Sequence, residues 1–166
     1  MSIVCLSTAY LAPVSYYCKL YAFDTVQLET CENYRKQTCR NRCRIATANG
    51  IQELTVPVEK SPAPKILTRD IRISDHGNWR HLHWNALVSA YNMSPFFEYY
   101  ADDFAPFYEK KFTFLMDYNE ALQHLICDLI DLRPQIIHTG TYEPDIPNDF
   151  RNAFHPRHPH DDPSFH

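Results

Sequence analysis

The first thirty residues carry an apolar pattern that predicts a strand, a helix and a second strand. Residues 2–7 form a short and largely apolar run, which is typical of a buried strand. Pro13 suits the entry of a helix that continues to about Ala22, and residues 25–29 have the pattern of a second strand. Such a unit forms a parallel crossover, whose ligand lies beyond the carboxyl end of the first strand. The side chains expected near that cleft are Thr8, Tyr10, Ser15 and Tyr16.

The middle of the chain predicts an antiparallel hairpin. Asn49 and Gly50 separate residues 42–46 from residues 52–58, and both tolerate the positive φ of a type I′ turn. The two prolines within residues 60–65 indicate a surface loop. Residues 70–73 have the pattern of one further strand.

From Trp79 onward the apolar period becomes helical. Asn78 stands where an N-cap is needed, and the pair Ser94-Pro95 predicts that another helix starts there. Pro106 divides that helix from the next, and residues 117–120 have a capping-box pattern before a last apolar stripe. The apolar face of the first of these helices comprises Trp79, Leu82, Ala86, Leu87, Ala90 and Tyr91.

The helical apolar pattern ends at Leu132. The segment beyond it holds six of the 12 prolines and five of the nine histidines, which predicts little regular structure. We therefore expect an α/β fold, in which a small mixed β-sheet from the N-terminal half is covered by three or four helices from the C-terminal half. Residues 1–133 form a single domain in this interpretation, and residues 134–166 are an irregular Pro/His-rich segment of that domain.

Composition excludes several common sites. The chain has three glycines, Gly50, Gly77 and Gly140, so it lacks a dinucleotide fingerprint, a Walker A loop and a GxSxG elbow. No apolar stretch is long enough to span a bilayer, and the N-terminus lacks the basic region of a signal peptide. The expected location is the cytoplasm, where the six cysteines are expected to be reduced structural thiols.

Charge is divided unevenly along the chain. Residues 1–69 carry 9 Lys and Arg against 5 Asp and Glu, although the net charge of the whole chain is -4. The excess comes from a basic run without an intervening acid, Arg35, Lys36, Arg40, Arg42 and Arg44. Guanidinium groups bind phosphate or carboxylate through two parallel hydrogen bonds, and Gln37 and Asn41 can add neutral ones. The alternative is a solvated basic loop. A general nucleic-acid binder is not expected, because the pI is 6.1.

His83 is the second candidate for chemistry. It lies four residues after Trp79 and four before Leu87, close to the middle of the apolar helical face. A neutral imidazole at that position can serve as a general base, and a hydrogen-bonded core histidine explains the position equally well. His81 points away from that face and is expected to be exposed.

Metal binding is not expected. Cys31, Cys39 and Cys43 do not form a CxxC pair and lack a fourth ligand, which structural zinc requires. The histidines of the tail can retain nickel or zinc adventitiously, and they are His155, His158, His160 and His166. We also expect no cofactor.

Several spaced segments resemble one family. They are STAYLAPVSY at residues 7–16, ENYRKQTCRNRCRI at residues 32–45, NGIQELTVPV at residues 49–58 and SPFFEYY at residues 94–100. Together with Trp79, His83 and Tyr91 they resemble the WbqC-like protein family, which is named from bacterial O-antigen gene clusters. The resemblance implies a role in surface-polysaccharide assembly, with transfer from a sugar, acyl or aminoacyl donor as the suggested activity. It also implies that the sequence lacks a C-terminal segment, because related chains continue beyond residues 163–166.

The family's motifs fall on the residues already singled out. Its KQxxRNR motif corresponds to Lys36, Gln37, Arg40, Asn41 and Arg42, and its WxxxH pattern corresponds to Trp79 and His83. A later family segment at residues 148–157 places an arginine and a His-Pro pair at Arg151, His155 and Pro156.

Two functions follow as hypotheses. In the first, the protein is a transferase whose anionic donor is a nucleotide sugar or an activated acyl or aminoacyl group. Lys36, Arg40 and Arg42 hold that donor and His83 accepts a proton from the acceptor. Further residues expected to bind substrate are Tyr10, Tyr16, Gln37, Asn41, Trp79, Arg151 and His155. In the second, a non-catalytic binding or scaffold protein uses Phe96, Phe97, Tyr99 and Tyr100 for a partner. The oligomeric state stays open.

Overall fold

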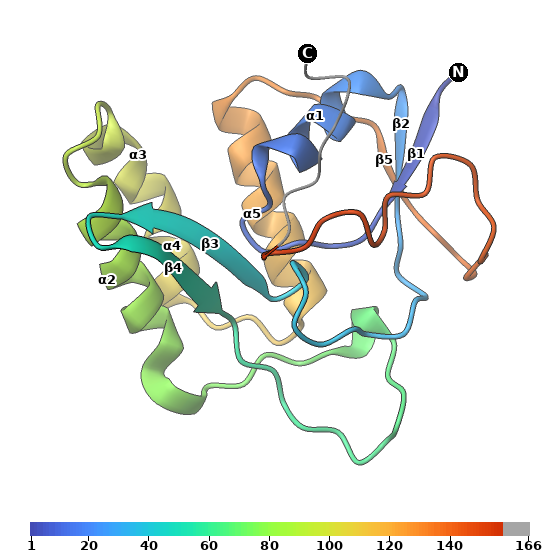
Figure 1. Ribbon diagram of the computed structural model, residues 1–166, viewed down its shortest axis with the longest axis horizontal. Helices are drawn as coiled ribbons and strands as arrows, with labels where there is room; N and C mark the ends of the chain where they lie inside the picture. The colour runs from blue at the N-terminus through green and yellow to red at the C-terminus, as the bar shows by residue number, and fades with distance from the viewer. Residues whose placement is uncertain (158–166) are drawn as a thin grey trace.

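The predicted strand, helix and strand at the N-terminus are confirmed by the computed structural model, which describes residues 1–157. Strand β1 (Ile3–Leu6) lies parallel to β2 (Thr25–Leu28), and helix α1 (Val14–Ala22) connects them (Figure 1). Pro13 precedes the first turn of α1 with φ of -66°, and no side chain caps that turn. Strand β1 is almost wholly buried, as its apolar run requires.

A third parallel strand comes from the segment after Leu132. Strand β5 (Ile136–His138) pairs with β2 and gives the order β1-β2-β5. On the other side of β1, the Cys5 amide donates to the Asn148 carbonyl at 3.0 Å, and the Phe150 amide donates to the Cys5 carbonyl at 2.9 Å. The expectation of little regular structure after Leu132 was wrong at β5, because the unpaired edge of β2 supplies partners for even a three-residue strand.

The hairpin of β3 (Arg42–Thr47) and β4 (Gly50–Thr55) is confirmed and forms a second sheet, separate from the parallel strands. The predicted type I′ turn was wrong. Gly50 has a φ of 107°, whereas Asn49 does not have a positive φ. Thr47 stabilises this turn instead, because its hydroxyl donates to the Gly50 carbonyl at 2.7 Å and accepts from the Asn49 amide at 3.3 Å.

The connection between hairpin and helices contains two short 3-10 helices, η1 (Thr68–Asp70) and η2 (His76–Asn78). The strand expected at residues 70–73 was wrong, because its residues form only isolated bridges. Ile73 pairs with Val58, and Arg72 pairs with Phe114. Single bridges satisfy these backbone groups without a ladder.

The C-terminal half supplies α2 (Trp79–Tyr91), α3 (Phe97–Phe104), α4 (Pro106–Glu109) and α5 (Leu115–Leu129). The predicted caps are corrected. Asn78 adopts a left-handed backbone conformation and its side chain makes no capping bond. Asp117 lies inside the first turn of α5, whose N-cap position is Phe114, so residues 117–120 do not form a capping box.

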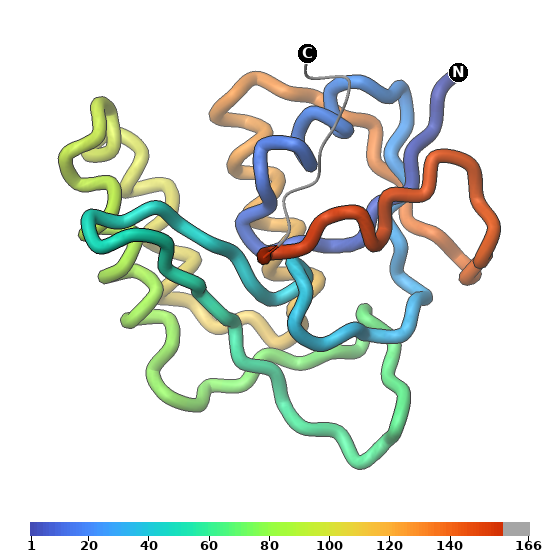
Figure 2. The backbone as a smooth tube through the Cα atoms, in the orientation of Figure 1, coloured from blue at the N-terminus to red at the C-terminus, as the bar shows by residue number. Residues whose placement is uncertain are grey.

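Two apolar cores lie on either side of α5. Leu115, Tyr118 and Leu122 of α5 join the core between the hairpin and α2, and Cys127 joins the core beneath the parallel sheet and α1. The backbone trace follows this arrangement, with α5 between the hairpin side and the sheet side of the molecule (Figure 2). Since both cores share α5, that helix fixes the position of the hairpin relative to the carboxyl ends of the parallel strands.

Candidate functional site

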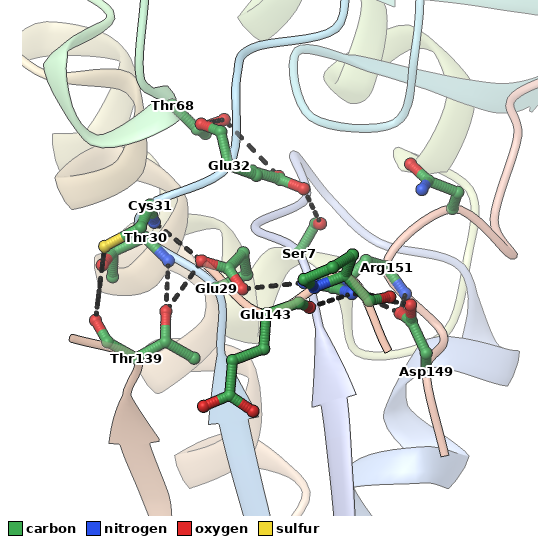
Figure 3. A network of polar contacts seen from close by, with 12 residues as sticks. Ser7, Glu29, Thr30, Cys31, Glu32, Thr68, Thr139, Glu143, Asp149 and Arg151 are labelled. Carbon is green, nitrogen blue, oxygen red and sulfur yellow. Dashed lines mark hydrogen bonds and ion pairs between the residues drawn. The ribbon is translucent and has the colours of Figure 1, made fainter. Parts of the chain in front are cut away.

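A buried polar network lies where the three parallel strands end (Figure 3). Ser7 follows β1, Glu29 follows β2 and Thr139 follows β5. The Glu29 carboxylate accepts the Thr139 hydroxyl at 2.8 Å and the Arg151 guanidinium at 3.0 Å. The carboxyl edge of a parallel sheet is the usual position of a ligand in open α/β folds, but here protein groups fill its centre.

Arg40 belongs to this network and makes a buried two-point ion pair. Its Nε and Nη2 donate to the two oxygens of Glu32 at 2.7 and 2.8 Å. Nη2 also donates to the Ser7 hydroxyl at 3.0 Å, the Arg151 carbonyl at 3.3 Å and the Asn152 side chain at 3.2 Å. The Arg40 side chain is 4% exposed. Its donors therefore hold the protein together and do not face an open cleft.

Arg151 makes a second buried cluster. Its Nε and Nη2 donate to the Asp149 carboxylate at 2.9 and 2.8 Å, and its Nη1 donates to Glu29. The guanidinium also lies 4.7 Å from the centre of the Tyr142 ring. The side-chain hydrogen bonds between Arg151 and Asp149 lower the pKa of the Asp149 carboxyl and raise the pKa of the Arg151 guanidinium. Arg40 and Arg151 together anchor the segment around residue 150 to the sheet.

Beside this network lies a cleft of about 290 Å³, here called the basic cleft. Alternation along β3 directs Cys43 and Ile45 into the core and places Arg42 and Arg44 on the opposite face. The segment that carries His155 lines this cleft as well. The residues lining the basic cleft are Leu11, Pro13, Ser15, Cys39, Arg42, Cys43, Arg44, Ile51, Phe154, His155 and Pro156.

The charges of the basic cleft are only partly compensated. Arg42 Nη1 donates to Glu53 at 3.2 Å, while Arg42 Nε is buried and has no hydrogen-bond partner within residues 1–157. Arg44 donates to the Pro156 carbonyl at 3.3 Å. The first turn of α1 begins at the rim after Pro13, and its amides carry partial positive charge. The basic cleft thus combines two arginines with the amino end of a helix.

Two thiols in the cleft wall are not nucleophiles at neutral pH. Burial raises the pKa of Cys39 to about 11 and that of Cys43 to about 12. Both side chains therefore stay protonated, and a thiol is a much weaker nucleophile than a thiolate. The basic cleft therefore does not present an activated cysteine.

His83 lies in the core and not in the basic cleft. Its Nδ1 is 2.9 Å from the Tyr10 hydroxyl, which is 2.8 Å from the Tyr108 hydroxyl. The ring also hydrogen bonds to the backbone of Thr55. Burial lowers the pKa of His83 to about 4, against the smaller effect of that backbone bond. The imidazole is therefore neutral at physiological pH and stacks against Tyr10 and the edge of Trp79.

The remaining predicted residues are dispersed. The Tyr16 hydroxyl donates to the Ser7 carbonyl at 2.7 Å, and Trp79 Nε1 donates to the Ser74 carbonyl at 2.9 Å. The Asn41 side-chain Nδ2 donates to the Val56 carbonyl at 3.0 Å, and Gln37 is exposed with a φ of 60°.

Lys36 lines a different cleft of about 420 Å³, together with Lys60 and Lys65. The structure thus brings Arg42, His155 and Ser15 into one cleft and joins Arg40 to Arg151 in the buried network. Tyr10, Trp79 and His83 stack in the core. Tyr16 touches the edge of the buried network through the Ser7 carbonyl, whereas the side chains of Lys36, Gln37 and Asn41 join none of these groups.

Residue-by-residue reasoning missed four important side chains of this region. Arg44 belonged to the basic run but was not assigned to a site, although it shares a strand face with Arg42. Glu29, Glu32 and Asp149 supply the buried carboxylates. The position of Glu29 directly after β2 was the available signal, because polar residues at that edge face the region where ligands bind.

The described residues give no metal centre, since residues 1–157 contain no group of three or more His, Cys, Asp or Glu side chains arranged around a metal. All six cysteines lie within that range and are unpaired. None of the helices in this part of the chain combines the length and apolar character needed to cross a membrane.

Comparison with known proteins gives a consistent assignment. The sequence pattern of the WbqC-like protein family matches residues 8–151. The uncharacterised protein Rv1507c of Mycobacterium tuberculosis is 34% identical over 111 residues, which are 66% of this chain and 48% of that protein. The match thus spans about half the length of that relative. No solved structure matches the chain.

Proposed function

The chain belongs to the WbqC-like protein family, and from that premise we propose that it is a transferase-like protein of bacterial surface-polysaccharide assembly that binds an anionic donor in the basic cleft. The observation that carries this proposal is the pairing of Arg42 and Arg44 on one face of β3, in a cleft that Ser15 of the first turn of α1 also lines. Arg42 Nε is buried and has no hydrogen-bond partner in the described chain, so the hydrogen-bonding capacity of this guanidinium is not fully used by the protein.

The basic cleft suits a phosphate or carboxylate group. Arginine presents donors in a planar fork that matches either anion, and a helix N-terminus adds amide donors with partial positive charge. Glu53 offsets part of this charge at 3.2 Å from Arg42. A donor that carries more than one negative charge, such as a diphosphate, gains most from the arrangement, because a second charge engages Arg44 as well.

Fixed positive groups at this position also favour transfer. When the bond to the donated group breaks, negative charge develops on the departing phosphate or carboxylate, and guanidinium groups that are already in place stabilise it. His83 serves this site indirectly in our proposal. Its neutral ring holds the Tyr10 hydroxyl and so positions the loop between β1 and α1, which carries Leu11 and Pro13 of the cleft wall.

Ligand-induced stabilisation tests the proposal, because a ligand that binds only the folded state raises its melting temperature. The panel comprises nucleotide sugars, nucleoside diphosphates, acyl phosphates and aminoacyl donors. We expect one anionic class to raise Tm, and the rise to disappear in Arg42→Ala. Arg35→Ala is the matched control, because Arg35 belongs to the same basic run and does not line the basic cleft. The donor site would be refuted if both variants lost the ligand-induced rise in Tm equally, or if no anion raised the Tm of the parent protein.

A non-catalytic binding protein is the second candidate, and a specific observation favours it. Arg40, Arg42 and His83 do not converge on one cleft, and an apolar groove of about 470 Å³ lies beside α2 and α3. Phe97 and Tyr100 line this groove, and Phe96 and Tyr99 are largely exposed nearby. Tight binding of a donor without turnover, in the presence of any acceptor tested, would select this function over transfer.

A further inference from the structure

The apolar groove is built almost entirely from hydrocarbon side chains. It runs between α2, α3, the C-terminal half of α5 and strand β3, and its volume of about 470 Å³ falls in the range of small-molecule sites. Trp84 and Leu87 form one wall, Tyr100 and Phe104 form the second, and Ile126 and Leu129 form the third. A surface of this kind in contact with water favours an apolar ligand.

Leu11 lines both the apolar groove and the basic cleft. Strand β3 contributes to both sites as well, because Arg42 and Arg44 line the cleft and Ile45 lines the groove. A cationic site and an apolar site therefore meet at one residue and one strand. The two cavities adjoin at Leu11, although Arg42 and Arg44 lie on the face of β3 opposite to Ile45.

The backbone of Leu11 supports this interpretation. Leu11 has a φ of 41°, in the left-handed region that residues with a Cβ rarely adopt. Its neighbour Tyr10 is held in place, since the Tyr10 amide donates to the Cys39 carbonyl at 2.9 Å and the Tyr10 side chain is fully buried. Strained backbone conformations persist where the surroundings enforce them, and they occur often at ligand sites. Here the strain places the Leu11 side chain between groove and cleft.

We propose that the protein binds a single anionic amphiphile, with its phosphate or carboxylate head in the basic cleft and its apolar chain in the apolar groove. This inference rests on the proposed function and narrows its donor to a molecule in which the anion is attached to an apolar chain. The head group interacts with Arg42 and Arg44, and the chain passes Leu11 to reach the aromatic walls of the groove. The opposite chemistry of the two adjoining sites favours this ligand over a protein partner.

A chain-length series measures the contribution of the groove directly. Hexyl, octyl, decyl and dodecyl phosphate, each below its micelle concentration, are titrated into the protein by calorimetry, with inorganic phosphate as the headgroup alone. Burial of each added methylene is expected to tighten Kd about fourfold until the groove is full. Arg42→Ala is expected to weaken every member of the series by a similar factor.

Ile130→Glu tests the groove without touching the core, because Ile130 lines the groove and is 56% exposed. The variant is expected to abolish the dependence of Kd on chain length and to leave the affinity for inorganic phosphate unchanged. Leu82→Glu is the matched control. Leu82 is 59% exposed on α2 and does not line the groove, so its variant should retain the full chain-length dependence.

The other outcomes separate the two proposals. Phosphate binding that does not depend on chain length overturns the amphiphile and leaves the anionic donor site intact, whereas absence of binding by every phosphate overturns both. Equal affinity for dodecanol and dodecyl phosphate means that the phosphate contributes nothing to binding of the chain, which overturns an anionic amphiphile as the ligand. Binding only to anionic phospholipid vesicles identifies a membrane surface as the occupant, and a dimer that Ile130→Glu dissociates identifies a second copy. Either result overturns the proposal.

Discussion

The hydroxyl of Tyr10 lies 2.9 Å from Nδ1 of His83, and this bond joins the loop after β1 to the middle of α2. Since the ring also hydrogen bonds to the Thr55 backbone, one imidazole connects the parallel sheet, the hairpin and α2. The Tyr108 hydroxyl extends the chain at 2.8 Å from that of Tyr10. Burial favours the neutral imidazole, in which one ring nitrogen accepts and the other donates.

Acid should weaken the folded protein through His83. Its folded pKa of about 4 lies below the ordinary value of 6.5, so the unfolded chain binds a proton in that interval that the folded chain does not. The contribution of His83 to the free energy of unfolding is therefore fully present above pH 6.5. It is lost as the pH is lowered to about 4, and the total loss is on the order of 3 kcal/mol. Urea titrations at half-unit pH steps measure this loss.

The variant His83→Gln isolates that contribution, because glutamine keeps polar atoms at the position and does not titrate. We expect its stability to change less between pH 6.5 and 4 than that of the parent chain. His81→Gln, at an exposed position two residues away, should reproduce the parent profile. Parallel profiles for the parent chain and His83→Gln would contradict the assignment.

The ion pair between Arg40 and Glu32 should contribute strongly to stability when only one partner is removed. Arg40→Met leaves the Glu32 carboxylate buried with its charge uncompensated, and the expected loss is about 3–5 kcal/mol. The double variant Arg40→Met with Glu32→Leu should lose less than the sum of the two single variants, because neither charge remains. Denaturant titration of all four proteins gives the coupling energy.

Arg133→Ala provides the comparison for an exposed pair. Arg133 lies 3.3 Å from Asp128, but both side chains are more than half exposed, so the stability of this variant should stay within experimental error of the parent.

A strictly additive double variant at positions 32 and 40 would mean that the buried pair contributes nothing through its mutual contact.

The hairpin turn should depend on the glycine at residue 50. Gly50 has a φ of 107°, and although a Cβ there would meet no atom within 4 Å, the backbone conformation itself is unfavourable for alanine. Gly50→Ala should therefore lower the free energy of unfolding by about 1 kcal/mol. Gly140→Ala, which also has open space and lacks a positive φ, should leave stability equal or slightly higher. Thermal unfolding of both variants decides the matter, and equal Tm values would refute strain at Gly50.

Much of the fold followed from local pattern. The strand, helix and strand at the N-terminus, the hairpin and α2 each carry an apolar period long enough to define the element. Strand β5 carries no such period, because it has only three residues, which fit many conformations. Its formation depends on pairing with the edge of β2, which is distant in the sequence. The turn at Asn49 was predicted from residue type, whereas Thr47 hydrogen bonds determine its geometry.

The candidate site was less predictable for a related reason. A basic motif indicates where cations lie along the chain but not which carboxylates meet them. Glu32 binds Arg40 from eight positions away, and Glu29 binds Arg151 across 122 positions. Only the fold therefore distinguishes arginines used for anchoring from Arg42 and Arg44, whose position follows from alternation along β3 once that strand is known.

The walls of the basic cleft come from opposite ends of the described chain, with Ser15 near its start and His155 near its finish. During synthesis the α1 side of the cleft and the hairpin can form early, but the last wall exists only after residue 155 has left the ribosome. The buried carboxylate of Glu29 is likewise paired only after Arg151 has been synthesised. The anion affinity that we propose for the basic cleft should therefore arise in one late step, together with the last of the chain's stability.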